Sequence, residues 1–173
     1  MKKFKLSKKD IYDLASVMAS VVREQSEKLD FKEVIHLQKT VNQLISEIKD
    51  FSDEFDKISK DKQLLVEVSN KKISEYKQKL HKKADEKEEI DESYKEKLDN
   101  FVQIILDEAN EQIYKEISPQ YDAIYSGIGE NVVEIELSDD KYSILVINFE
   151  KYAKEKYTNK SKMVEIYETL VAA

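Results

Sequence analysis

The sequence predicts a mainly α-helical (α+β) protein built around one long antiparallel helical hairpin, or coiled coil. Only 2 of the 173 residues are Gly and 1 is Pro, so most of the chain carries no residue that ends a helix. Along a central segment, apolar residues recur at alternating steps of three and four, which is the spacing of a coiled-coil seam. After residue 131 the period changes to two, which is typical of a strand.

The N-terminal helix is predicted over residues 7 to 25. Ser7 followed by Asp10 resembles a capping box, with an acidic residue where Glu or Gln is usual. The apolar residues that follow lie at helical spacing: Ile11, Leu14, Met18 and Val21. Asp30 with Glu33 repeats the capping pattern, so a short connection should end there and a second helix begin.

The second helix carries the clearest pattern in the sequence. Its seam residues follow one another by threes and fours without exception: Val34, Leu37, Val41, Leu44, Ile48, Phe51, Phe55 and Ile58. The repeat slips at Lys62, which locally unwinds a supercoil without ending the helix, and then resumes as far as Leu80. Residues 81–89 hold one apolar residue, Ala84, and are therefore predicted to form the tip of the hairpin.

A third helix, predicted over residues 90 to 117, completes a hairpin that spans residues 30–117. Its seam includes Phe101, Ile105 and Ile113. Folding the chain back near Ala84 places Phe55 opposite Ile113 and the apolar segment 64–68 opposite 101–106. This match favours a hairpin within one chain, while two helices exchanged between protomers stay open as an alternative.

The C-terminal part is predicted to contain a β-hairpin over residues 131–149. Val133, Ile135 and Leu137 alternate with their neighbours, residues 138–141 have the composition of a turn, and residues 142–149 are rich in β-formers. An isolated two-stranded hairpin is marginal in water, so it must rest on helices or pair with another chain. Short helices over residues 150–171 follow. We expect a single domain, residues 1–173.

Composition narrows the classes of partner. The formal charge of -7 repels phosphate backbones and anionic membrane surfaces, so we expect no direct contact with nucleic acid or membrane. The basic N-terminus lacks the apolar run of a signal peptide, and no stretch approaches the roughly 20 apolar residues that span a bilayer. The absence of cysteine fits a reducing compartment. We therefore expect a cytoplasmic location.

The sequence also lacks the usual signatures of catalysis. It has no G-x-S-x-G turn and no cysteine nucleophile, and its two histidines, His36 and His81, are far apart in the chain. The acidic run 85–89 lacks the pattern of an EF-hand loop. We expect no enzyme, no catalytic residue, no metal and no cofactor. The tyrosines at 76, 94, 121 and 125 lie near apolar faces and are predicted to pack in the core.

One acidic set is a candidate for partner binding. It has no basic residue among it and lies on or beside the predicted strand: Glu130, Glu134, Glu136, Asp139 and Asp140. Such a negative edge could contact a basic groove. It could equally serve to discourage edge-to-edge aggregation of strands.

The order of features resembles a group of short, uncharacterised proteins of tailed phages. The similar stretches are the Lys-rich segment from Lys5 to Met18, the segment from Phe31 to Ile58, and the NVVEIEL segment from Asn131 to Leu137, together about half of the chain. The resemblance implies a helical pair followed by a small α/β ending, and phage origin. It brings no catalytic residues with it.

Two functions follow from this reading. The first is a non-enzymatic structural or protein-interaction adaptor that uses a projecting coiled-coil arm, about residues 55 to 105, in phage assembly or bridging. Its partner would be a phage structural protein, with the chain acting alone or as a homo-oligomer, in the virion or the host cytoplasm. The alternative is an anti-defence protein, such as an anti-CRISPR-like inhibitor, whose acidic surface binds a host defence nuclease.

Overall fold

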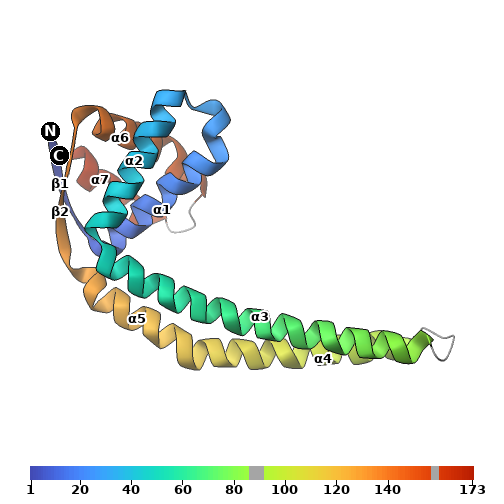
Figure 1. Ribbon diagram of the computed structural model, residues 1–173. Helices are drawn as coiled ribbons and strands as arrows, with labels where there is room; N and C mark the ends of the chain where they lie inside the picture. The colour runs from blue at the N-terminus through green and yellow to red at the C-terminus, as the bar shows by residue number, and fades with distance from the viewer. Residues whose placement is uncertain (86–91, 157–159) are drawn as a thin grey trace. The chain divides into compact units, whose positions relative to one another are not determined.

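The computed structural model describes residues 1–85, 92–156 and 160–173 (Figure 1). The chain divides into two compact units: unit 1 comprises residues 1–54 and 124–173, and unit 2 comprises residues 55–123. The described residues are mainly helical and contain a two-stranded antiparallel sheet, which confirms the predicted mainly α, α+β class. A single domain over residues 1–173 stays a prediction.

Unit 1 combines the sheet with helices from both ends of the chain. Its elements, in chain order, are β1 (Lys2–Ser7), α1 (Lys8–Gln25), a 3-10 turn (Ser26–Lys28), α2 (Phe31–Glu47), the start of α3 (Lys49–Asp85), the end of α5 (Ser118–Ser126), a 3-10 turn (Ile128–Glu130), β2 (Val132–Leu137), α6 (Asp139–Lys156) and α7 (Lys160–Val171). Helix α1 contacts α2 and α6, and α6 also contacts α2 and α7.

Both predicted helix starts are confirmed. The Ser7 hydroxyl oxygen accepts a hydrogen bond from the Asp10 backbone N–H at 3.3 Å and caps α1. Asp30 and Glu33 form a complete capping box, in which each side chain accepts from the other residue's backbone N–H, at 2.9 and 3.0 Å. These local bonds satisfy helix N–H groups that have no partner within the helix.

The sheet differs from the predicted β-hairpin. Strand β2 lies where the first predicted strand was placed, but it pairs with β1 at the N-terminus, from Lys2 opposite Leu137 to Ser7 opposite Val132. Strand β1 was not predicted. Its alternation is visible in the sequence, since Phe4 and Leu6 are buried and Lys3 and Lys5, which precede them, face solvent.

The predicted turn and second strand of the β-hairpin, residues 138–149, are wrong. Residues from Asp139 onward form α6, which continues to Lys156 and so absorbs the first of the predicted C-terminal short helices. The backbone N–H of Tyr142 bonds to the Ser138 carbonyl, and two acidic residues occupy the first turn, where the helix dipole favours them. Leu145, Phe149 and Tyr152, at helical spacing, are buried, so packing overrides the β-rich composition.

The predicted continuous seam is divided between the two units. Helix α2 ends at Glu47, and Ile48 leaves helical geometry with φ -119° and ψ 29° before α3 begins. Leu37, Leu44, Ile48 and Phe51 are fully buried in unit 1, where the Phe51 ring packs against Tyr12 and Tyr125. Val41 is also buried there, and Val34 is half-buried.

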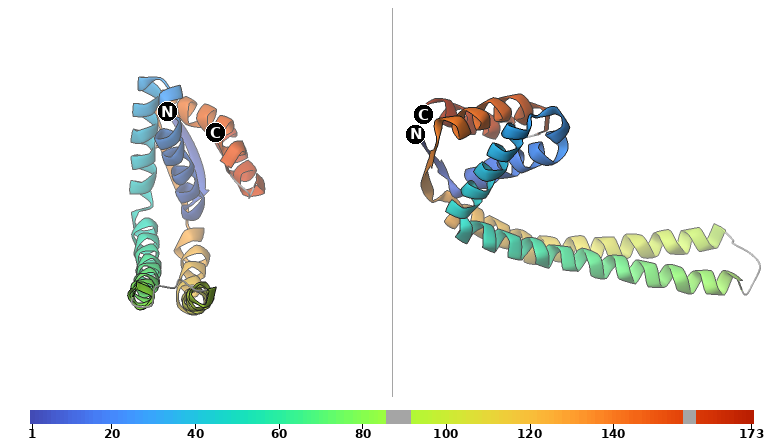
Figure 2. Two further views of the ribbon diagram at one scale, coloured as in Figure 1. Left: turned by 90° about the vertical axis from the view of Figure 1, so that its right-hand side faces the viewer. Right: turned by 45° about the horizontal axis from the view of Figure 1, so that its top comes forward.

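Unit 2 is an antiparallel helical pair, as predicted. It contains α3 from Phe55 onward, α4 (Glu92–Gln112), a π-helical turn (Ile113–Ile117) and α5 as far as Ala123. Figures 1 and 2 show α3 and α4 side by side. Of the predicted tip, residues 81–85 belong to α3, and residues 86–89 lie outside the described residues.

The predicted pairing of the two helices is wrong by eight positions, about two turns. The Phe55 ring lies against Tyr121, with ring centroids 5.0 Å apart, and not against Ile113. Tyr76 stacks on Phe101 at 3.9 Å, and His81 lies 5.4 Å from Tyr94. The pairing shifts because these aromatic contacts replace the expected contact between segments 64–68 and 101–106. The predicted packing of Tyr76, Tyr94 and Tyr121 in the seam is confirmed.

The seam of unit 2 is narrow. Among the described residues its most buried side chains are Ile58, Ser69, Ile105, Ala109 and Ile117. Phe55, Phe101 and Ile113 are half-buried. In the π-helical turn, the Ser118 N–H bonds to the Ile113 carbonyl five residues back, which takes the chain into α5 immediately before Pro119, a residue without an N–H of its own.

Candidate protein-interaction surfaces

The acidic set that the sequence singled out is largely neutralised by β1 and the start of α1. Glu134 lies 3.3 Å from the ammonium of Lys3 and 3.6 Å from that of Lys5, and Glu136 lies 3.7 Å from Lys3. Asp139 pairs with the N-terminal amine at 3.1 Å, and Glu130 pairs with Lys9. Because pairing β1 with β2 supplies these cations, the set is not the uncompensated negative edge that sequence spacing indicated.

These ion pairs also change the titration of the groups. The hydrogen bond from Lys3, together with its charge, lowers the pKa of Glu134, and the same contact raises the pKa of Lys3. The hydrogen bond from Lys8 lowers the pKa of Asp50. The Lys3 and Glu134 side chains are 55% and 46% exposed, so salt screens their attraction and its contribution to stability is small.

A groove of about 640 Å³ in unit 1 is lined by residues of β1, α1, β2 and α7. Its charged lining includes Lys9, Asp10, Glu130 and Lys162, and these residues are paired with one another or with neighbours. Lys162 lies 3.4 Å from Asp10 and 2.5 Å from Asp13. Burial lowers the pKa of Lys162, but the Asp13 hydrogen bond and the two carboxylate charges outweigh it and raise that pKa overall. The groove therefore presents little uncompensated charge to a ligand.

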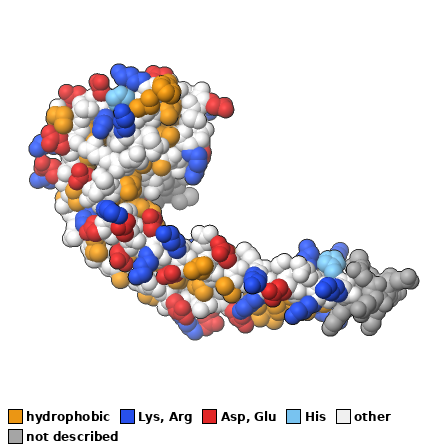
Figure 3. Space-filling model, viewed as in Figure 1, with side chains coloured by type: hydrophobic (Ala, Val, Ile, Leu, Met, Phe, Trp, Pro, Cys, Tyr) orange, Lys and Arg blue, Asp and Glu red, His pale blue; other side chains and the backbone are white. Residues whose placement is uncertain are grey.

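The hairpin of unit 2 exposes large apolar side chains on both of its helices. On α3 these are Leu64, Val66 and Val68, which are 57%, 41% and 52% exposed. On α4 they are Ile104 and Leu106, which are 55% and 41% exposed. Figure 3 shows hydrophobic atoms on the surface of the hairpin between charged side chains. These residues belong to the two segments that the sequence predicted to bury against each other.

Helix geometry sorts these residues onto two faces. In an antiparallel pair of right-handed helices, residues that immediately precede seam positions point to one side, and residues that follow them point to the other. Face A consists of the residues that immediately precede the seam positions Leu65, Ser69, Ile73, Ile105 and Ala109. It therefore carries Leu64, Val68 and Lys72 of α3 and Ile104 and Glu108 of α4. Face B carries Val66 and Asn70 of α3 and Leu106 and Asn110 of α4. Among the apolar residues of segments 64–68 and 101–106, those on face A are the more exposed; Tyr114, which is 76% exposed and follows seam residue Ile113, belongs to face B.

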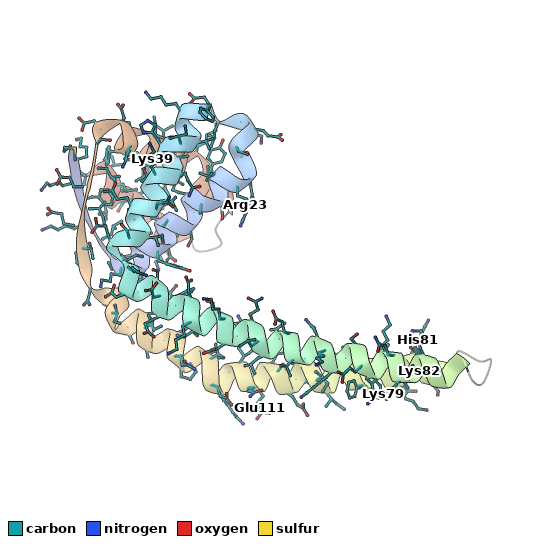
Figure 4. The ribbon with its side chains drawn as sticks, viewed as in Figure 1. Arg23, Lys39, Lys79, His81, Lys82 and Glu111 are labelled. Carbon is teal, nitrogen blue, oxygen red and sulfur yellow. The ribbon has the colours of Figure 1, made fainter. Side chains whose placement is uncertain are left out.

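The two helices of the hairpin carry opposite charge. Between Phe55 and Lys82, α3 has twice as many lysines as acidic residues. From Ser93 to Ala123 the acidic residues outnumber lysines by more than two to one. Figure 4 shows Lys79, His81 and Lys82 near the C-terminal end of α3, and Glu111 on the outer side of α4. Lys115, in the π-helical turn, pairs with Glu111 at the end of α4.

Sequence reasoning missed both faces of the hairpin. It treated all apolar residues of segments 64–68 and 101–106 as buried, although two adjacent residues of a helix cannot both lie on a narrow seam. The run of three apolar residues in LLVEV, with a fourth beyond Glu67, is wider than the seam that a two-helix pair can cover. That excess width was the signal for an exposed apolar surface.

Searches for metal sites, membrane spans and relatives gave no match. Among residues 1–85, 92–156 and 160–173, no cluster of three or more His, Asp or Glu side chains is placed to hold a metal. Within the same part of the chain, no helix is both long and apolar enough to cross a membrane. No protein-family model, curated protein or solved structure matches the chain.

Proposed function

We propose that this chain is a non-enzymatic protein-interaction adaptor whose helical hairpin binds a protein partner through face A. The observation that carries the proposal is the exposure of Leu64, Val68 and Ile104, each more than half accessible to solvent and all on one face. Scattered apolar residues are normal on protein surfaces, but a group on one face marks an interaction site. Burying a half-exposed Leu, Val or Ile contributes about 1 kcal/mol, so three of them support a real association.

An adaptor of this kind fits assembly or bridging, which is one of the two roles that the resemblance to tailed-phage proteins implies; the other is an early protein that acts on host machinery. The anti-defence alternative depended on an uncompensated acidic surface. Four of its five residues, Glu130, Glu134, Glu136 and Asp139, form ion pairs within unit 1. That surface would therefore attract a basic groove of a partner less strongly than the sequence indicated. We therefore favour the adaptor over the inhibitor.

Photocrosslinking in producing cells tests the proposal. Benzoylphenylalanine is placed at Leu64 or Ile104 of the full chain, and at the exposed polar residues Gln63 and Gln103 as matched controls. Each control is the chain neighbour of its test position but points away from face A. We expect discrete adducts from positions 64 and 104 and far weaker ones from 63 and 103.

Equal labelling at all four positions would show that the hairpin has no preferred interface, and the adaptor proposal would fail. Mass analysis of each adduct separates an adduct of two copies of this chain from an adduct with another protein.

A further inference from the structure

We propose that the partner of face A is a second copy of this chain. Two hairpins pack face A to face A about a two-fold axis parallel to the helices, so that α3 of each copy lies against α4 of the other. This inference rests on the proposed function, because it assumes that face A is an interface. It goes further by naming the occupant and its orientation.

The opposite charges of α3 and α4 are the reason for choosing a second copy of this chain as the partner that binds face A. In this arrangement the lysine-rich α3 lies beside the acidic α4 of the second copy on both sides of the axis. The opposite arrangement, α3 against α3, would set lysines against lysines and acidic residues against acidic residues. A surface that carries both charges in this order is complementary to itself.

Particular residues of face A match across the axis. The contacts of Phe55 with Tyr121 and of Tyr76 with Phe101 set the level of each residue along the hairpin. Within about one helical turn, Lys57 then meets Glu116 of the second copy, Lys72 meets Glu108, and Glu75 meets Lys97. Two like-charged pairs also lie level, Lys79 with Lys97 and Asp61 with Glu116. In the described part of the chain, none of these side chains has an ion pair within 4 Å, so each is available to a partner.

The apolar residues fit the same arrangement. Lys72 lies level with Ile104 of the second copy, so its methylene chain covers that side chain while its ammonium reaches Glu108 one turn away. Val68 comes within about one turn of the same Ile104, and the two-fold axis repeats these contacts. From Lys57 to Lys79 the face is about 33 Å long and about 20 Å wide, or on the order of 650 Å² per copy. That area suits a dimer of moderate affinity, since stable interfaces bury about 800 Å² per partner.

Sedimentation velocity of the full chain over a concentration series is the first test. We expect a reversible monomer–dimer equilibrium. The variant Val68→Lys/Ile104→Lys should raise the dimer dissociation constant by about a hundredfold, because each change acts twice across the axis. Val66→Lys/Leu106→Lys places the same charges on face B and should leave that constant within about threefold. Circular dichroism of each variant checks that the helices are intact.

A charge-reversal cycle is the second test and fixes the orientation. Lys72→Glu alone and Glu108→Lys alone should each weaken the dimer about tenfold. The double variant Lys72→Glu/Glu108→Lys exchanges the charges and should recover most of the affinity of the original chain. An arrangement with α3 against α3 predicts no recovery, and that result would overturn the proposed orientation.

The outcomes separate this inference from the proposed function. A chain that stays monomeric at every concentration, yet gives adducts with another protein at positions 64 and 104, overturns the second copy and leaves the adaptor in place. A dimer weakened by the face B variant and not by the face A variant overturns the inference as well. Loss of specific adducts at 64 and 104 would overturn both.

Discussion

At the scale of single residues, the charges of unit 1 are arranged by partners that are distant in the chain. Glu134 looked unpaired because its sequence neighbours carry no positive charge, whereas its cations, Lys3 and Lys5, belong to a strand about 130 residues away. The Lys162 ammonium is likewise held by Asp10 and Asp13 of α1. The sequence shows which residues are charged, but the pairing of β1 with β2 decides which of these charges have an ion-pair partner.

The lowered pKa of Glu134 predicts how acid acts on unit 1. Its folded-state pKa lies below the ordinary value of 4.5, so its ion pair stabilises the fold above pH 4.5 and loses that effect as the pH falls through the folded-state pKa. Glu134→Gln should therefore lower the thermal midpoint slightly near neutral pH. The difference from the original chain should shrink below pH 4.5. Thermal denaturation followed by circular dichroism at a series of pH values measures it.

Lys3→Gln is the matched variant, because it removes the other half of the same ion pair. It should abolish most of the effect of Glu134→Gln when the two changes are combined. A difference between the original chain and Glu134→Gln that stays constant across the whole pH series would contradict a role for the Lys3 contact.

At the scale of elements, α6 shows how tertiary packing overrides local preference. Residues 142–149 are rich in β-formers, but Leu145 and Phe149, four apart, are both buried, while Ile147 is 59% exposed. In a strand, Leu145, Ile147 and Phe149 would share one face. Their unequal burial is the pattern of a helix that lies on α1, α2 and α7.

Two alanine substitutions distinguish the helix from the predicted strand. Leu145→Ala should lower the free energy of unfolding by about 2–4 kcal/mol, because it leaves a cavity in the core of unit 1. Ile147→Ala, on the exposed side of α6, should change it by less than about 1 kcal/mol. Urea denaturation measures both. Similar large losses in the two variants would fit a strand and contradict the helix.

The register of the hairpin is the second feature that packing decides at this scale. Several registers align apolar residues of α3 and α4, because both helices have apolar runs wider than their seam. The contacts of Phe55 with Tyr121, of Tyr76 with Phe101, and of the Ser59 hydroxyl with the Tyr121 hydroxyl at 2.9 Å select one of them. Aromatic rings gain from such pairing beyond the area that they bury.

Engineered cysteines can test this register cleanly, since the chain has none of its own. Phe55→Cys/Tyr121→Cys should be joined efficiently by a short bifunctional thiol reagent. Phe55→Cys/Ile113→Cys, the pair expected from a fold point near Ala84, should react poorly because the two sites are displaced by about 12 Å along the helices. Non-reducing electrophoresis reads the result, and a reversed order of yields would contradict the observed register.

At the scale of the whole molecule, the two units have very different cores. Unit 1 buries side chains from α1, α2, α6, α7 and both strands, among them Leu14, Met18, Leu44, Leu145 and Ile166. Unit 2 buries a single line of residues, and two of its most buried side chains are the small residues Ser69 and Ala109. A two-helix pair has only one inner side, so it buries less apolar area per residue than several packed elements.

This difference predicts unequal protection from hydrogen exchange. Amides of α1, α2 and α6 should exchange only through global opening of unit 1, whereas amides of α3 after Phe55 and of α4 should exchange at least tenfold faster. Exchange measured by mass spectrometry at low protein concentration, where two copies do not associate, gives the comparison. Slower exchange in the hairpin than in α1 would contradict it.

The sequence by itself determined the helical class, the starts of α1 and α2, strand β2 and the antiparallel pairing of α3 with α4. These features depend on residues close in the chain, through caps, periodicity and the near absence of Gly and Pro. Only the tertiary structure decided the partner of β2, the helical state of residues 139–156, the register of the hairpin and the exposure of face A. Each of these depends on contacts between residues that are distant in sequence, and many such contacts are compatible with one local pattern.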